Sequence, residues 1–238
     1  MARLAGRGSQ AVLRRDLLEI GRRLYERGLV VAAEGNISAR LSNGRILITS
    51  AGVCKGRMKK VNLVMVDPAG KKISGRLRPS TEIGMHLTVL RARADIHACV
   101  HAHPPYATAF ATAGVALDQC VLPEIIATLG SIPLAAYATP STPEVGAAIE
   151  PYLATHDAFL LRNHGVLTLG PDLETAYRRM ETVERYAQIL YLARAIGPVT
   201  TLTAKQVDAL LALAPDVRRR FAKSGVPVCG DTMAKDGK

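Results

Sequence analysis

The spacing of apolar residues along the chain predicts an alternation of helices and short strands. Over residues 9–27, leucine, isoleucine and valine recur at helical spacing, and Gly28 follows as a typical helix-ending residue. The pattern then changes to short apolar runs that flank Asn43-Gly44 and, further on, Asp67-Pro68-Ala69-Gly70. Both turn sequences are typical of β-hairpins. A helix is expected over residues 80–93, opened by hydroxyl side chains that favour N-capping.

The second half of the chain continues the alternation. Strands are expected at residues 96–100, 132–137, 158–161 and 166–169. Helices are expected at residues 106–113, 122–129, 144–153, 173–196 and 203–213. Because the sequence has no repeat, low-complexity linker or break in composition, we expect one α/β domain over residues 1–221. Residues 222–238 have the character of a flexible C-terminal tail.

The composition is that of a globular protein. Of its 238 residues, 48% are hydrophobic and 21% are charged. No apolar run approaches the roughly 18 residues that span a bilayer, and the N-terminus lacks the apolar core of a signal peptide. We therefore expect a soluble, cytoplasmic protein without a membrane partner. The four cysteines form no CxxC pair or regular framework, which predicts reduced thiols packed as small hydrophobic groups.

The net charge of +11 is compatible with a nucleic-acid partner or with a small anionic substrate and a basic surface. Much of the excess lies near the chain ends and in helices, including Arg3, Arg7, Arg14 and Arg15. The sequence contains no known nucleic-acid-binding motif. With three Phe, seven Tyr and no Trp, it also offers few rings for base stacking. A small anionic substrate is therefore favoured over nucleic acid.

The most informative motif is His101-Ala102-His103, which ends an apolar run and is followed by Pro104-Pro105. On a strand, residues two apart point to the same face, so the two imidazoles would project side by side. Such a pair provides two nitrogen ligands for zinc, and a catalytic zinc site needs three protein ligands. The alternative is one hydrogen-bonded core histidine and one exposed histidine at a strand end.

Two further residues strengthen the hypothesis of a metal site. His164 also follows an apolar strand and precedes Gly165, so a second strand end could deliver a third imidazole. His86, His97 and His156 fit a shared site less well, and we expect them to be structural. Glu82 is the candidate acid/base, because a carboxylate beside a metal can ligate the ion and also transfer a proton. Alternatively, Glu82 is only an acidic residue in the first turn of a helix.

Three short stretches have the features of anion-binding turns. They contain Asn36 after Gly35, Gly52 after a strand, and Ser80-Thr81 at a predicted helix start. Backbone N–H groups and hydroxyls in such turns can hold a phosphate. Each stretch is weak evidence alone, since Ser, Thr and Gly occur in turns of every kind.

These motifs occur together in an order that resembles one family. The motifs are Gly35-Asn36-Ile37-Ser38, Ile48-Thr49-Ser50-Ala51-Gly52, Pro79-Ser80-Thr81-Glu82, His101-Ala102-His103-Pro104 and Asn163-His164-Gly165. The chain resembles the class II, zinc-dependent aldolase/epimerase family over residues 13–197. The resemblance implies a three-layer α/β/α domain with a largely antiparallel central sheet. It also implies a homotetramer with its sites at subunit interfaces.

The same resemblance assigns roles to individual residues. One divalent ion per subunit, usually Zn²⁺ with Mn²⁺ or Co²⁺ as alternatives, would be bound by His101, His103, His164 and Glu82. Glu82 would also act as the catalytic acid/base. The substrate phosphate would be held by Asn36, Gly52, Ser80 and Thr81. The implied reaction is cleavage of a C–C bond in a phosphorylated ketose through a metal-stabilised enediolate, giving dihydroxyacetone phosphate and an aldehyde.

Two departures from the family pattern concern the substrate and the exact reaction. Ala51 stands where sugar-phosphate members carry a hydroxyl, and Leu122 stands where the aldolases carry a proton-donating tyrosine. Glu124 or Tyr106 could supply that proton. A decarboxylase, epimerase or dehydratase acting on a sugar acid, a pentulose phosphate or a catechol acid is therefore the alternative. A non-enzymatic basic binding protein is a remote one.

Overall fold

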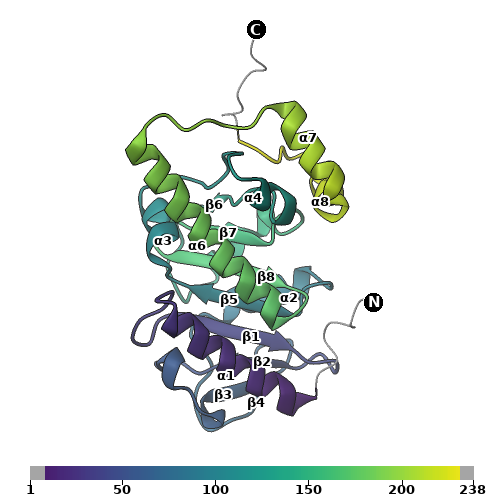
Figure 1. The fold of residues 1–238 in the computed structure, drawn as a ribbon. Coiled ribbons are helices and arrows are strands. Elements are labelled where there is room, and N and C mark those ends of the chain that lie inside the picture. Colours follow the sequence, from purple (N-terminus) through teal and green to yellow (C-terminus); the bar gives the residue numbers. More distant parts are fainter. Residues whose placement is uncertain (1–8, 231–238) are drawn as a thin grey trace.

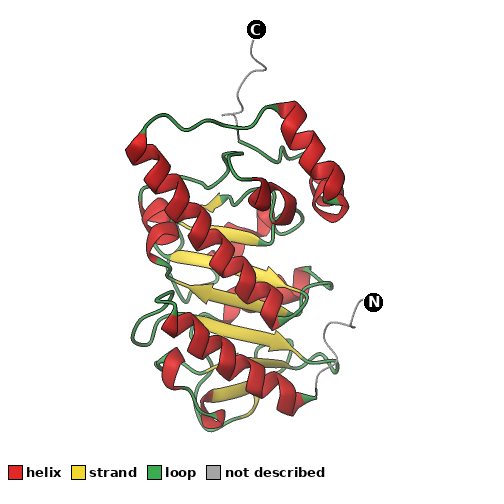
Figure 2. Ribbon diagram, viewed as in Figure 1, coloured by secondary structure: helices red, strands yellow, loops and turns green. Residues whose placement is uncertain are grey.

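The computed structural model describes residues 9–230, which form an α/β fold (Figures 1 and 2). Its strands are β1 Asn36–Arg40, β2 Ile46–Thr49, β3 Leu63–Val66, β4 Lys72–Ser74, β5 Ala98–Ala102, β6 Leu134–Ala135, β7 Ala158–Leu161 and β8 Gly165–Gly170. Its α-helices are α1 Gln10–Glu26, α2 Ile83–Ala92, α3 Pro105–Thr112, α4 Pro123–Thr128, α5 Glu144–Ile149, α6 Leu173–Ile196, α7 Ala204–Leu213 and α8 Pro215–Ser224. Short 3₁₀ helices are η1 Lys55–Arg57, η2 Lys60–Asn62 and η3 Glu150–Tyr152.

The strands form one sheet in the order β4-β3-β2-β1-β5-β8-β7-β6. All neighbouring strands are antiparallel except the edge pair β6 and β7, so the predicted largely antiparallel sheet is confirmed. The Asn-Gly sequence forms the β1–β2 hairpin as predicted, and the Oδ1 atom of Asn43 accepts a hydrogen bond from the backbone N–H of Arg45. β5 lies in the middle of the sheet, between β1 and β8.

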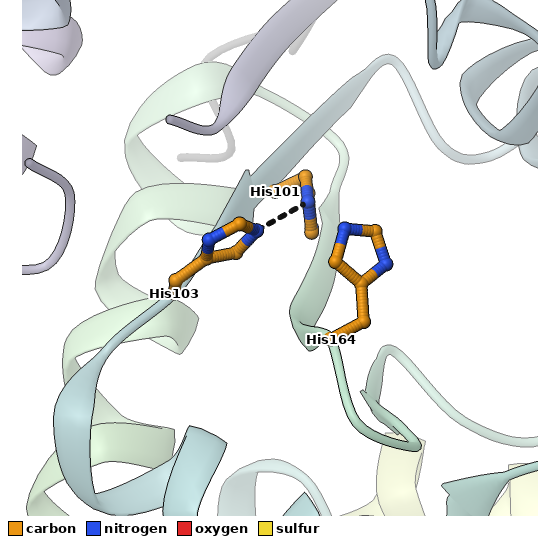
Figure 3. A group of neighbouring side chains, drawn as sticks. All are labelled: His101, His103 and His164. Carbon is orange, nitrogen blue, oxygen red and sulfur yellow. Dashed lines mark hydrogen bonds between the residues drawn. The ribbon is translucent and has the colours of Figure 1, made fainter. Parts of the chain in front are cut away.

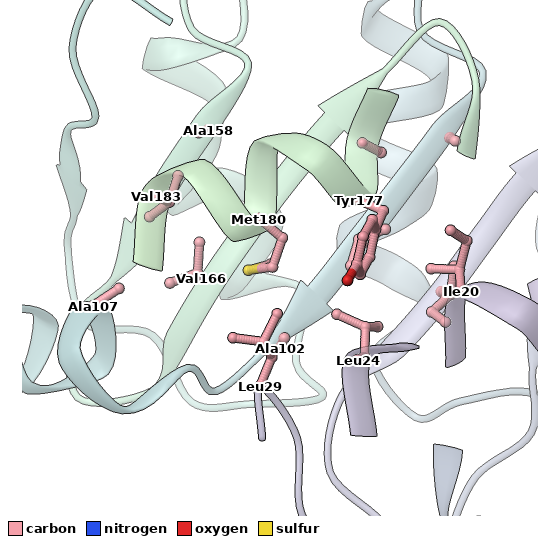
Figure 4. Packing of buried hydrophobic residues seen from close by; sticks show 14 of the residues in the cluster. Ile20, Leu24, Leu29, Ala102, Ala107, Ala158, Val166, Tyr177, Met180 and Val183 are labelled. Carbon is pink, nitrogen blue, oxygen red and sulfur yellow. The ribbon is translucent and has the colours of Figure 1, made fainter. Parts of the chain in front are cut away.

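Helices cover both faces of the sheet, as expected for three layers. On one face, α1 and α6 pack against the strands through residues such as Leu24, Tyr177 and Met180 (Figure 4). On the other face, α2 and α5 contribute Met85 and Ile149 to a second apolar core. Because strand side chains alternate between faces, a sheet with two apolar faces needs helices on both sides. The predicted α/β/α architecture is confirmed.

The C-terminal region packs further than the predicted boundary at residue 221. α8 extends to Ser224, and Val217 and Phe221 on this helix join a small apolar core with α4 and α7. Cys229 is buried and forms a disulfide with Cys120, with their Cα atoms 5.5 Å apart. The prediction of reduced thiols is therefore wrong for this pair, which the fold brings together across 109 residues. The rest of the expected tail, residues 231–238, lies outside the described residues.

The disulfide makes a testable prediction about thiol content. Denatured, unreduced protein should present two reactive thiols, those of Cys54 and Cys99, and should present four after reduction. A chromogenic thiol assay measures this directly, and four reactive thiols before reduction would contradict the pairing. In the chain-entropy account, a loop of this length contributes about 4–5 kcal/mol to stability. The thermal midpoint should therefore fall in Cys229→Ser.

The basic N-terminal residues and the possibility of a membrane-spanning helix were also considered in the sequence. Arg3 and Arg7, which were counted with the basic residues near the chain ends, lie outside the described residues. Within residues 9–230, no helix combines the length and the apolar character that a bilayer crossing needs.

Candidate metal centre

His101 and His103 come from the C-terminal end of the central strand β5. His101 is the fourth residue of β5 and is fully buried, whereas His103 follows the strand and is partly exposed. Both rings turn toward one point, and their Nε2 atoms are 3.2 Å apart (Figure 3). The strand periodicity therefore places the two imidazoles together, as the spacing predicted.

His164 joins them from the tight turn between β7 and β8. The turn requires a positive φ of 57° at Asn163, a residue type that tolerates this conformation. Gly165 then lets the chain pass close to the first pair, because a Cβ there would lie 2.6 Å from the His103 ring. The ring centroid of His164 is 4.7 Å from that of His101 and 5.1 Å from that of His103.

The three imidazoles fit a divalent metal of the zinc type. Their ligand nitrogens all lie within 4.8 Å of one another. The Nδ1 atom of His101 donates to the carbonyl oxygen of Val166 at 2.9 Å, because a carbonyl can only accept, and this leaves the Nε2 lone pair facing the centre. Tetrahedral zinc with Zn–N bonds of about 2.0–2.1 Å needs nitrogens about 3.3 Å apart, close to the 3.2 Å between His101 and His103.

Glu82 completes the centre with a carboxylate. Its Oε2 atom lies 3.3 Å from Nε2 of His101, and its Oε1 atom lies 3.2 Å from Nε2 of His164. Oε1 is buried without a hydrogen-bond partner among the described residues, as expected of an atom positioned to ligate a cation. Burial raises the pKa of Glu82, but the nearby imidazoles of His101 and His164 outweigh it and hold the pKa below its usual range. Glu82 is therefore ionised at neutral pH.

A hydrogen-bond chain behind Glu82 fixes its orientation. Nδ2 of Asn36 donates to Oε2 of Glu82 at 2.7 Å, while Oδ1 of Asn36 pairs with Nε2 of the fully buried His86. Nδ1 of His86 lies 2.7 Å from Oγ of Ser38, and burial lowers the pKa of His86 to about 3, so the ring is neutral. The sequence signal for this link is the helical spacing between Glu82 and His86. The sequence analysis assigned His86 only a structural role, so it missed the hydrogen bond from His86 to Asn36.

The other candidate phosphate-binding residues lie on segments next to Glu82. Ser80 is held to the end of β2 by a hydrogen bond from its backbone N–H to the carbonyl oxygen of Thr49 at 3.0 Å. This contact keeps Ser80 extended, so α2 begins at Ile83 rather than at residue 80, and Oγ of Ser80 accepts from the N–H of Glu82. Thr81 is exposed beside it. Gly52 follows β2 in a turn with φ of 67°.

Sequence reasoning also missed Lys55, which is 1% exposed. Its ammonium donates to the carbonyl oxygens of Val53 at 2.6 Å and Ala33 at 3.1 Å. It thereby links the turn that follows Gly52 to the loop that precedes Asn36. Burial lowers the pKa of Lys55 to about 8. The signal in the sequence was a lysine that directly follows the small and apolar residues of the turn at 51–54.

The lowered pKa of Lys55 predicts a pH-dependent stability. Between pH 8 and the usual lysine value of 10.5, the unfolded chain holds a proton that the folded chain has released. The free energy of unfolding should therefore rise by about 3 kcal/mol as the pH is raised through this window. The contribution of Lys55 to that free energy is lowest below pH 8. Urea unfolding measured against Lys55→Met isolates the effect. The same difference measured with Lys60→Met, an exposed lysine, should be close to zero; equal slopes for both variants would contradict the assignment.

Comparison with known proteins shows the family of the chain. The sequence model of the class II aldolase and adducin N-terminal domain matches residues 15–191, so the chain belongs to that family.

Among its relatives, a 3-oxo-tetronate 4-phosphate decarboxylase of Pectobacterium atrosepticum is 29% identical over 79% of this chain and 88% of its own. A methylthioribulose-1-phosphate dehydratase of Methylococcus capsulatus is 34% identical, covering 71% and 88%. An L-fuculose phosphate aldolase of Methanococcus maripaludis is also 34% identical, covering 74% and 95%. The solved structure of an L-fuculose 1-phosphate aldolase superposes with a TM-score of 0.80 at 29% identity, covering 88% of this chain and 98% of its own. Relatives of similar identity thus carry out three different reactions.

Leu122, at the position of the family tyrosine, and the two proposed substitutes, Glu124 and Tyr106, lie at the starts of α4 and α3. Leu122 precedes α4 and packs against the apolar core under α6. Glu124 is exposed in the first turn of α4. The ring of Tyr106 at the start of α3 lies 5.7 Å from that of Tyr191. The backbone N–H of Tyr106 donates a hydrogen bond to Oε1 of Glu184 on α6.

Proposed function

We propose that the protein is a metal-dependent lyase that cleaves a C–C bond next to the carbonyl group of a phosphorylated ketose. The observation that carries the proposal is the convergence of three Nε2 atoms with both oxygens of Glu82 at one point. Zn²⁺ is the ion that suits this nitrogen-rich donor set, with Mn²⁺ or Co²⁺ as alternatives. When bound there, a divalent ion supplies positive charge that stabilises a developing enediolate.

The residues of this chain supply the remaining parts of the reaction. Glu82, held by Asn36 and ionised at neutral pH, can take up the proton that the substrate hydroxyl loses and give it to the carbon at which the bond has broken. Ser80, Thr81 and Gly52 offer hydroxyl and backbone N–H groups to the substrate phosphate. Asn36 is assigned to the phosphate by its family position, but its Nδ2 already donates to Glu82. Its proposed role is therefore to orient the carboxylate as well as the substrate.

A second candidate reaction is decarboxylation of a phosphorylated 3-oxo acid. The observation that favours it is Leu122, an apolar residue at the position where the aldolases of the family carry a proton-donating tyrosine. Loss of CO₂ leaves an enediolate that needs one proton at carbon, which Glu82 would take up from solvent and pass on, and no aldehyde oxygen requires a second acid. Dehydration or epimerisation of a sugar phosphate uses the same metal centre with a different leaving group.

A two-product assay separates these candidates. Zinc-loaded protein is incubated with ketose 1-phosphates and with 3-oxo-tetronate 4-phosphate, and dihydroxyacetone phosphate and CO₂ are measured in parallel. Aldol cleavage predicts dihydroxyacetone phosphate from the ketoses, and decarboxylation predicts CO₂ from the oxo acid. Release of neither product from any phosphorylated substrate, by protein with a filled metal site, would contradict the proposal.

The proposal includes a homotetramer located in the cytoplasm. Support for self-association comes from apolar side chains exposed near the end of α6, where Tyr191 is 55% and Ile196 is 89% exposed. Light scattering after size-exclusion chromatography tests the assembly. The Cys120–Cys229 disulfide argues against a cytoplasmic location, because disulfides are rare in the cytosol. The thiol assay described above, applied to freshly lysed cells, tests whether the disulfide is present in the cell.

A further inference from the structure

A large cavity lies at the end of the sheet opposite the metal centre. It has a volume of about 940 Å³ and is lined by residues from the first half of α6, the end of α4 and α8; Figure 1 shows where these helices lie in the fold. Asp95 and Ile96 line it just before β5 begins, whereas His101 and His103 lie where β5 ends. Five strand residues span about 15 Å, so the cavity is separate from the metal centre.

The wall of this cavity holds a cluster of charged side chains in which positive charges outnumber negative ones. Three guanidinium groups, those of Arg93, Arg179 and Arg220, converge on the single carboxylate of Asp157, whose side chain is 4% exposed. The nitrogen–oxygen distances are 3.1 Å for Arg93 and 2.8 Å for Arg179. Asp95 pairs with Arg93 at 2.6 Å, but its side chain is 65% exposed. The partly buried positive charge therefore exceeds the buried negative charge.

The arginines also retain unused hydrogen-bonding capacity. Nε of Arg220 is buried without a partner among the described residues. Burial, together with the positive charge of Arg93, lowers the pKa of both Arg179 and Arg220 to about 10. Such a cluster is costly to bury unless another anion compensates it.

Three more cations line the cavity from exposed positions. Arg178 pairs with Glu174 and Arg219 pairs with Asp216, so their charges are partly compensated. Lys223 makes no ion pair within residues 9–230. α8 is also attached through Val217 and Phe221, which pack into the apolar core with α4 and α7. The Arg and Lys side chains that line the cavity outnumber its carboxylates, those of Asp95, Asp157 and Asp216.

We propose that this cavity, which we call the arginine cavity, binds a small multiply charged anion of the oligophosphate class. Guanidinium groups match the geometry of phosphate oxygens and hold them by paired hydrogen bonds. The volume is in the range of small-molecule sites, which accommodate ligands of nucleotide or sugar-phosphate size. The site is distinct from the proposed substrate site, and its occupancy does not depend on the reaction that the metal centre performs.

Calorimetric titration of the full chain with inorganic pyrophosphate tests this proposal. The wild type should show saturable binding that weakens as NaCl is raised. The double variant Arg219→Glu/Lys223→Glu should bind at least about tenfold more weakly, because charge reversal replaces attraction by repulsion. The charge-matched control Arg15→Glu/Arg45→Glu, on exposed positions of α1 and the β1–β2 hairpin, should bind like the wild type. Binding at the metal centre would be equal in both double variants.

A single substitution in α8 provides a second test of the arginine cavity. Lys223→Gln removes one unpaired charge and should weaken binding about threefold, which keeps the test open if the double variant fails to fold. No saturable binding to the wild type would overturn the proposal, as would equal binding by both double variants. If the α8 variants instead change only the molar mass in light scattering, the cluster is a contact between subunits and the proposal is wrong.

Discussion

Glu82→Gln should lose about 10²- to 10⁴-fold in turnover while keeping its metal, since general acid–base catalysis commonly contributes that much. The amide oxygen of Gln can still face the histidines, and its amide nitrogen cannot carry the catalytic proton. Because the pKa of Glu82 is held below its usual range by His101 and His164, the wild-type carboxylate is ionised at neutral pH and is in the form that can act as a base. Steady-state kinetics and metal content, measured on the same preparation, check both halves of the expectation.

The matched control for this variant is Glu34→Gln. Glu34 also lies beside the centre, with Oε2 at 3.7 Å from Nδ1 of His103, and it is 37% exposed. Its loss removes the same charge without removing the proposed acid/base, so turnover should fall only about tenfold, as for an outer ligand partner. If Glu82→Gln turned over as fast as Glu34→Gln, Glu82 would have no part in proton transfer.

Removal of the metal should abolish turnover and lower the thermal midpoint. A ligand that binds only the folded chain raises the free energy of unfolding by an amount that grows with the logarithm of the ligand concentration divided by its Kd. The apoprotein should therefore unfold at a lower temperature. Added Zn²⁺ should restore both properties. Mg²⁺ should restore neither, because it prefers oxygen ligands and this centre presents three imidazole nitrogens.

The check is activity and differential scanning calorimetry before and after dialysis against a chelator. The control variant is His156→Gln. His156 is a buried histidine outside the group His101, His103 and His164, and its ring centroid lies 5.1 Å from that of Phe221. This variant should respond to chelation as the wild type does. Full turnover by protein shown to be free of metal would refute a metal-dependent reaction.

The convergence of the histidines followed from local sequence rules. The alternation along β5 and the prolines after it put His101 and His103 on one face, and the glycine after His164 indicated a second strand end. The three-layer architecture also agreed with the family resemblance, because apolar runs without alternation predict strands covered on both faces.

What sequence reasoning missed depends on contacts between distant segments. The pairing of Cys120 with Cys229 spans 109 residues and has no spacing signature. α8 was not predicted, because Pro215 and a run of arginines conceal the two apolar residues that hold it. The link from His86 through Asn36 to Glu82 joins α2 to β1 and is visible only in three dimensions. Such contacts are set by tertiary packing, which one-dimensional patterns do not encode.

Metal content per chain, determined by plasma mass spectrometry on tag-free protein prepared without chelator, is the most direct test of the central claim. The wild type and His156→Gln should each contain about one zinc-type ion per chain. His103→Ala should lose that ion, because the substitution removes one of the three nitrogens. Absence of metal from the wild type, even after Zn²⁺ is added back, would mean that the histidines form no ligand set and that the family relationship extends only to the fold.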